Sequence, residues 1–120
     1  MDRRRFEQLV EEALDTLPPF FQEKLENIGV LVESLPDRET QESFPGGLLL
    51  GLYRGVPHTQ RSIFEPFRYP DLIFIYQRNI ERICRTDEEI RQQVRHTVIH
   101  EIGHHFGLDD DELRRLEEEE

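Results

Sequence analysis

His100-Glu101-Ile102-Gly103-His104-His105-Phe106-Gly107-Leu108-Asp109-Asp110, near the end of this chain, forms an HExxHxxGxxD pattern. Residues four apart share one face of a helix, so His100 and His104 can present two imidazoles to one Zn²⁺. Gly107 permits the left-handed turn that ends a helix, after which the chain can return and bring Asp110 to the same ion. The pattern therefore predicts a metal-binding helix followed by a tight turn.

Glu101 follows the first of these histidines and is a candidate general base for a zinc-activated water. Three residues compete for the position of the third ligand, because Asp109, Asp110 and Asp111 are consecutive. The spacing favours Asp110 without excluding its neighbours. The alternative is an ordinary surface helix with scattered histidines, in which Glu101 pairs with an arginine. Metal binding is the primary prediction, and hydrolysis depends on it.

The remaining histidines are expected to have other roles. His96 lies one turn before His100, but residues eight apart on a helix are separated by about 12 Å, too far for His96 and His104 to share one ion. A supporting or solvent-exposed role is expected for it. His105 should point toward the apolar side of the helix as a hydrogen-bonded core residue. His58 lies in a proline-rich segment and has no evident partner.

Length and composition favour one small domain, residues 1–116, followed by a solvated acidic tail at 117–120. The net charge of −11 should repel nucleic-acid phosphates, so nucleic acid is not an expected partner. No apolar run is long enough to cross a membrane, and no hydrophobic segment near Met1 resembles a signal peptide. The single cysteine, Cys84, excludes an internal disulfide and is expected to be a small core residue. Cytoplasmic residence is the expectation that follows.

Apolar periodicity and breaker residues predict both helices and strands. Helices are expected over 3–17, 20–26, 79–85, 87–106 and 111–116, strands over 30–35, 48–55, 61–64 and 72–76, and a surface loop over 36–46. Thr86 and Glu89 have the spacing of a capping box at the start of the long helix. Apolar residues surround the last two turns of that helix, which predicts a metal site set into the core.

The chain resembles a known family along most of its length. The resemblance lies in residues 6–10, 13–18, 27–30, 50–55 and 70–76 and, most specifically, in 97–108. These stretches are similar to the minimal zincins, a family of small bacterial proteins described as zinc metallopeptidases. The resemblance implies an α/β (α+β) zincin-like fold, in which a small mixed sheet packs against helices and the HExxH active-site helix crosses behind it. It also implies His100, His104 and Asp110 as zinc ligands and Glu101 as the base.

The pattern departs from the metzincin consensus in two ways. Aspartate replaces histidine at the third ligand position, and no methionine turn can follow because Met1 is the only methionine. The chain also lacks the residues for the lower substrate-binding subdomain of larger zincins. We therefore expect a substrate that is a short peptide or an unfolded protein segment, docked along an exposed strand edge at 48–54.

Other functions remain open from the sequence. The main alternative is a non-catalytic zinc-binding or interaction module on the same scaffold. A metal-dependent nuclease is disfavoured by the negative charge and by Glu101, which suits carbonyl hydrolysis. Candidates for stabilising the oxyanion are Tyr53, Arg54, Tyr69 and Tyr76, and the sequence does not choose among them. The same histidines also accept Co²⁺, Ni²⁺ and Cu²⁺.

Overall fold

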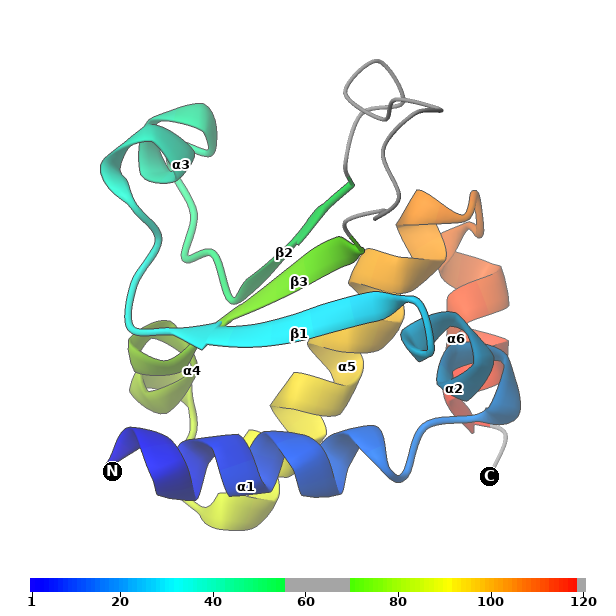
Figure 1. The fold of residues 1–120 in the computed structure, drawn as a ribbon, viewed down its shortest axis with the longest axis horizontal. Coiled ribbons are helices and arrows are strands. Elements are labelled where there is room, and N and C mark those ends of the chain that lie inside the picture. The colour runs from blue at the N-terminus through cyan, green and yellow to red at the C-terminus, as the bar shows by residue number, and fades with distance from the viewer. Residues whose placement is uncertain (56–69, 119–120) are drawn as a thin grey trace, which may run out of the picture.

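The fold is seen in a computed structural model, which describes residues 1–55 and 70–118. The described chain contains six helices and one three-stranded sheet (Figure 1). In chain order the elements are α1 (Arg3–Leu14), α2 (Pro19–Leu25), β1 (Ile28–Glu33), α3 (Arg38–Ser43), β2 (Gly51–Arg54), β3 (Asp71–Tyr76), α4 (Gln77–Ile83), α5 (Asp87–His105) and α6 (Asp110–Glu118). This arrangement confirms the predicted fold class of a small mixed sheet packed against helices.

The strand order is β1-β3-β2, so β3 is the central strand. β1 runs parallel to β3, with Val30 opposite Ile73, and β2 runs antiparallel to it, with Tyr53 opposite the same residue. Ile73 and Ile75 are fully buried because their face of β3 is covered by the helices. β2 is left as an edge strand of the sheet (Figure 1).

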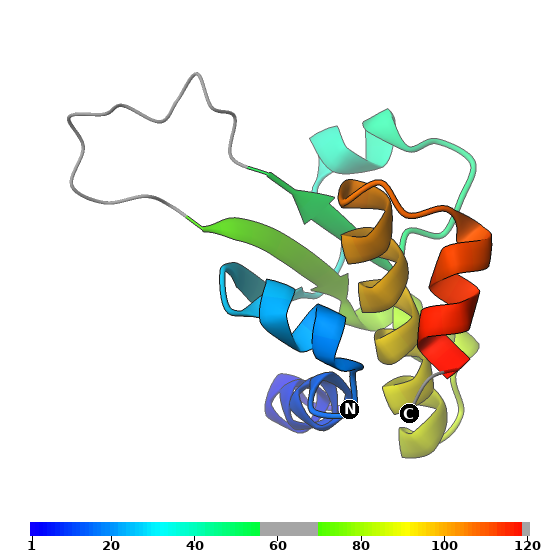
Figure 2. The ribbon, with the colours of Figure 1, turned by 90° about the vertical axis from the view of Figure 1, so that its right-hand side faces the viewer.

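Helix α5 forms the centre of the molecule. It contacts α1, the sheet and α6, and Figure 2 shows α6 packed along the side of α5. Its fully buried residues, Val94, Val98, Ile99 and Ile102, join the core with apolar residues from α1 and β3. This burial fixes the direction in which the remaining side chains of the helix point.

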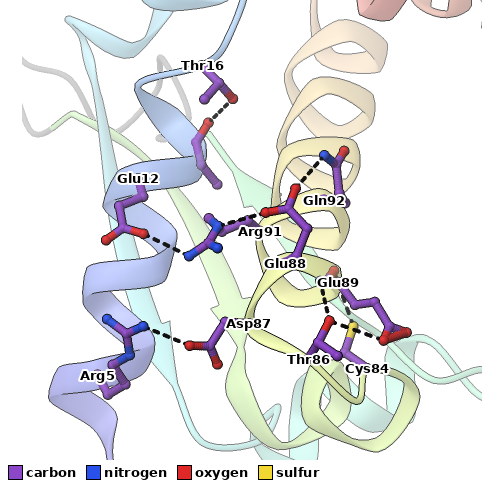
Figure 3. A network of polar contacts seen from close by, with 11 residues as sticks. Arg5, Glu12, Thr16, Cys84, Thr86, Asp87, Glu88, Glu89, Arg91 and Gln92 are labelled. Atoms are coloured by element: carbon purple, nitrogen blue, oxygen red, sulfur yellow. Dashed lines mark hydrogen bonds and ion pairs between the residues drawn. The ribbon is translucent and has the colours of Figure 1, made fainter.

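The start of α5 is held by a cap and by ion pairs with α1 (Figure 3). Thr86 Oγ1 accepts a hydrogen bond from the Glu89 N–H at 3.1 Å, which confirms the predicted Thr86 cap, and the Thr86 hydroxyl donates to Glu89 Oε2 at 3.3 Å. Arg5 pairs with Asp87 at 2.7 Å, and Arg91 reaches Glu12 on α1 at 2.9 Å. The helix that carries the histidines is thereby fixed in position along its axis.

Several predicted boundaries were wrong. The first helix ends at Leu14 instead of 17, the strand expected at 30–35 is Ile28–Glu33, and the strand expected at 48–55 is confined to Gly51–Arg54. The expected loop at 36–46 contains helix α3, because Asp37 accepts a hydrogen bond from the Thr40 N–H at 2.7 Å and caps it. This short helix is largely exposed and so has no apolar period to reveal it. The strand expected at 61–64 lies outside the described residues.

None of the helices in the described residues combines the length and the apolar character that a membrane crossing requires.

Candidate metal centre

The last turns of α5 carry His96, His100, Glu101 and His104, and the helix ends as the sequence predicted. Gly107 has a φ of 82°, in the left-handed region. Its N–H donates to the His104 carbonyl at 3.1 Å, and the Leu108 N–H donates to the Gly103 carbonyl at 2.9 Å. These two bonds define a Schellman motif, which reverses the chain so that α6 packs back against α5.

Helix α6 begins with three aspartates that have three different roles. Asp109 is its cap, since Oδ1 accepts from the Glu112 N–H at 2.8 Å and Glu112 Oε1 accepts from the Asp109 N–H at 3.3 Å. Asp111 pairs with Arg114 at 3.3 Å. Asp110 lies beside the histidine face of α5, with Oδ1 2.9 Å from His104 Nε2. The D-x-x-E spacing of Asp109 and Glu112 is a sequence signal that would have set Asp109 apart as a cap.

The structure therefore brings together the three residues favoured by the sequence spacing. One ligand atom from each of His100, His104 and Asp110 lies within 4.8 Å of the others. Around tetrahedral zinc, bonds of about 2.0–2.2 Å separate neighbouring ligand atoms by about 3.4 Å. Two imidazole nitrogens and a carboxylate oxygen are ligands that zinc prefers, so this donor set fits the metal with small side-chain adjustments. The hydrogen bond from His104 lowers the pKa of the Asp110 carboxyl, which favours the anionic, ligating form.

Glu101 is partly buried next to this group. Burial raises the pKa of its carboxyl, while a hydrogen bond from the Tyr53 backbone and the proximity of His104 act in the opposite direction. The contact with Tyr53 joins the carboxylate to strand β2. Glu101 thus lies between the two histidines of the group and an edge of the sheet, with its pKa moved toward the range that suits a general base.

His100 lies at the centre of the histidine face. Burial, and secondly its neighbour His96, lowers the pKa of its imidazole, whereas Glu117 acts to raise it. The net shift favours the neutral ring, which is the form that coordinates metals.

Glu117 is the residue near the centre that the sequence analysis missed. It was expected in a solvated tail, but α6 continues to Glu118 and places Glu117 Oε1 3.1 Å from His96 Nδ1. Its other oxygen, Oε2, lies 3.8 Å from His100 Nε2. The expectation of a frayed tail from residue 117 was wrong for Glu117, because the packing of Leu113 and the preceding turns of α6 carries this residue along α5.

The predicted core position of His105 was also wrong. His105 is exposed and stacks on the Tyr53 ring, with centroids 3.9 Å apart and the planes inclined by 19°. Phe106 is 44% exposed and lies under the Lys24 ammonium, 4.6 Å from its ring centroid. Side chains of His104 and Asp110 are 54% and 76% exposed. The candidate centre therefore lies at the surface instead of within the core, although Ile102 and Gly103 of the same turns are buried.

The candidates for oxyanion stabilisation in the described residues lie on two different faces of the sheet. Tyr53 is on the α5 face, where its hydroxyl donates to Asp71 at 2.7 Å. Side chains alternate along a strand, so Arg54 is on the opposite face, where it lies over Phe74. Tyr76 shares that face, stacked on Phe74, and is thus directed away from the centre. Tyr69 and His58 lie outside the described residues.

The model of the family described as "Zincin-like metallopeptidase" matches residues 25–120, which is most of the chain and includes α5 and α6. No curated protein matches the chain.

Proposed function

Because this chain belongs to the zincin-like metallopeptidase family, we propose that it is a zinc-dependent peptidase whose ligands are His100, His104 and Asp110 and whose general base is Glu101. The observation that carries the proposal is the convergence of the three ligand atoms within 4.8 Å beside a partly buried glutamate. The sequence spacing and the resemblance both implied these residues. The tertiary structure adds that α6 returns to α5 with Asp110, and not Asp109 or Asp111, facing His104.

The chemistry that zinc supplies when bound is Lewis acidity, which polarises a carbonyl group and lowers the pKa of water. Glu101 accepts the proton of the attacking water at its carboxylate and returns it to the leaving amine. Partial burial makes this carboxylate a stronger base than an exposed glutamate, because removal from water disfavours the charged form. The Tyr53 backbone hydrogen bond holds the carboxylate in place between the histidines and β2.

We place the substrate along the edge of β2 that pairs with no other strand of the described residues. The Leu50 carbonyl accepts from the Tyr76 N–H at 3.0 Å, so the backbone groups of Leu50 face β3. Backbone groups alternate in direction along a strand, so those of Gly51 and Tyr53 face away from the sheet. The hydrogen bond between Tyr53 and Glu101 is consistent with this direction. An extended peptide that pairs with this edge would run past the Glu101 carboxylate, as strand addition requires.

The edge also limits which substrates can enter. Tyr53 uses its N–H for Glu101, so a peptide on this edge would pair with the backbone of Gly51. A peptide can offer these bonds only where its own backbone is extended and unpaired. The substrate class is therefore a short peptide or an unfolded segment of a protein.

The test is hydrolysis of a peptide library by zinc-loaded wild type and Glu101→Gln, with bound zinc measured by elemental mass spectrometry. Glu101→Gln should keep its zinc and lose about 10²–10⁴-fold in kcat/KM, the usual contribution of a general base. Glu7→Gln, an exposed glutamate of α1, is the matched control and should retain full activity. Equal activity in wild type and Glu101→Gln would refute the assignment of the base. Bound zinc with no hydrolysis by either protein would support the non-catalytic alternative.

A further inference from the structure

We propose that His96, His100 and Glu117 form a second transition-metal site, which shares His100 with the first. One ligand atom from each of these residues lies within 4.8 Å of the others, the same criterion that the first group meets. The sequence argument excluded His96 from an ion bound by His104 because of their separation along α5. It does not exclude His96 from an ion bound by His100, which is one turn away.

Both imidazoles lie beside the Glu117 carboxylate, each near a different oxygen. His96 Nδ1 and Glu117 Oε1 are 3.1 Å apart, and His100 Nε2 and Glu117 Oε2 are 3.8 Å apart. Ligand atoms around tetrahedral zinc lie about 3.4 Å apart, so small side-chain adjustments would bring one Glu117 oxygen and the two imidazoles to one ion. Two imidazoles and one carboxylate form a donor set for Zn²⁺, and imidazole also suits Co²⁺, Ni²⁺ and Cu²⁺.

Each residue of the second group is held by secondary structure. His96 and His100 occupy successive turns of α5, with ring centroids 4.1 Å apart. Glu117 is in the last turn of α6, and its carbonyl accepts a hydrogen bond from the buried Arg95 at 3.3 Å. This bond holds the Glu117 backbone against α5, and the Glu117 side chain is 26% exposed. This degree of preorganisation distinguishes the group from a chance meeting of surface charges.

The second group is also accessible from solvent. His96 and Glu117 line an open hollow of about 390 Å³, together with Glu88, Glu89 and Gln92 of the first turns of α5. The hollow gives water or a small ligand room to complete the coordination of an ion. The glutamates on its walls produce a negative potential, which favours the entry of cations.

Because both sites use His100, an ion bound at one site prevents full coordination of an ion at the other. A neutral imidazole has one nitrogen with a free lone pair, so His100 can coordinate in only one group at a time. An ion held by His96, His100 and Glu117 would leave His104 and Asp110 without their common partner. Occupancy of the second site is therefore expected to remove the ion from the residues that the proposed peptidase activity requires.

The test removes the first site and measures what remains. The variant His104→Ala/Asp110→Asn is titrated with Zn²⁺ by calorimetry, and its metal content is measured by elemental mass spectrometry. We expect one zinc per chain. Adding Glu117→Gln or His96→Ala should weaken this binding by about tenfold or more, which corresponds to the loss of a ligand. Adding Gln92→Ala, an exposed residue of the same hollow, should leave the affinity unchanged. Circular dichroism establishes that each variant is folded.

Two results would overturn the second site, and a third would refute the sharing of His100. Absence of zinc binding by the folded His104→Ala/Asp110→Asn variant would show that the second group is no site, as would affinity that is insensitive to Glu117→Gln. Two zinc ions per wild-type chain at saturation would refute the sharing of His100. None of these measurements uses peptide hydrolysis, so the second site and the proposed activity can fail independently.

Discussion

Gly103→Ala tests how closely α5 and α6 must approach to assemble the candidate centre. Gly103 is buried between His100 and His104, where α6 packs against the helix. A Cβ at this position would overlap Leu113 Cδ2 and would lie 3.0 Å from both Cδ1 and Cγ of the same residue. Leu113 is fully buried, so its side chain cannot turn aside without displacing its neighbours in the core.

Two opposing effects decide the magnitude. Alanine is favoured over glycine in a helix interior by about 1 kcal/mol. Overpacking of a buried site costs about 1–3 kcal/mol, and overlap with Leu113 Cδ2 together with close approach to Cδ1 and Cγ argues for the upper part of that range. The free energy of unfolding should therefore fall by about 1–2 kcal/mol. A displaced α6 also moves Asp110, so zinc affinity should fall by about 10–100-fold, as when groups that position ligands are lost.

The assay is urea unfolding of Gly103→Ala, Leu113→Ala and the double variant, followed by circular dichroism. Leu113→Ala alone should cost about 2–5 kcal/mol, but it also removes the atoms that the new methyl group at position 103 would meet. The double variant should then lose about 1–3 kcal/mol less stability than the sum of the two single losses, whereas the losses at independent sites add within about 0.5 kcal/mol. Gly47→Ala is the control, since a Cβ there would meet nothing within 4 Å. An increase in stability on Gly103→Ala, or simple additivity with Leu113→Ala, would refute the reasoning.

Three further predictions concern local structure. Thr86→Ala removes the cap of α5 and should lower the free energy of unfolding by about 0.5–2 kcal/mol in urea titrations, with Thr86→Ser close to wild type. Burial and the nearby Glu89 raise the pKa of the Cys84 thiol, so alkylation by iodoacetamide at mildly alkaline pH should be slower than for a free thiol. Glu89→Gln should accelerate it, and an unchanged rate would exclude an electrostatic effect of Glu89. Hydrogen bonds from Thr40 lower the pKa of Asp37 below 3.8, so the α3 cap stabilises the fold above that pH. The stability difference between wild type and Asp37→Ala should accordingly shrink as the pH falls through the lowered pKa, and a constant difference in acid titrations would contradict this.

Much of the candidate centre is determined by contacts between residues that are close together in the sequence. A helix places residues four apart on one face, so the pairing of His100 and His104 needed no tertiary information. The end of α5 at the turn containing Gly107 was predicted because glycine tolerates its positive φ without cost. The Thr86 cap was equally local. In each case the deciding contact joins residues only a few positions apart.

Packing decided what lies around those histidines. Asp109, Asp110 and Asp111 are chemically identical, and the rotation of α6 about its axis determines which of them faces His104. That rotation is fixed by the burial of Leu113 against Gly103, a contact between two helices. The same packing brings Glu117 to His96, although the acidic run around it suggested a solvated tail. It also leaves His105 exposed against Tyr53, where the sequence predicted burial.

The sequence by itself thus determined the helix that carries the metal-binding pattern, its cap, its end and two of the three proposed ligands. The tertiary structure decided which aspartate faces His104, the position of Glu101 beside β2, the surface location of the centre and the second group around Glu117. The physical reason is the range of the interactions. Helix geometry and glycine conformation act within a few residues, whereas the relative positions of α5, α6 and the sheet depend on the fit of buried side chains that are distant in the chain.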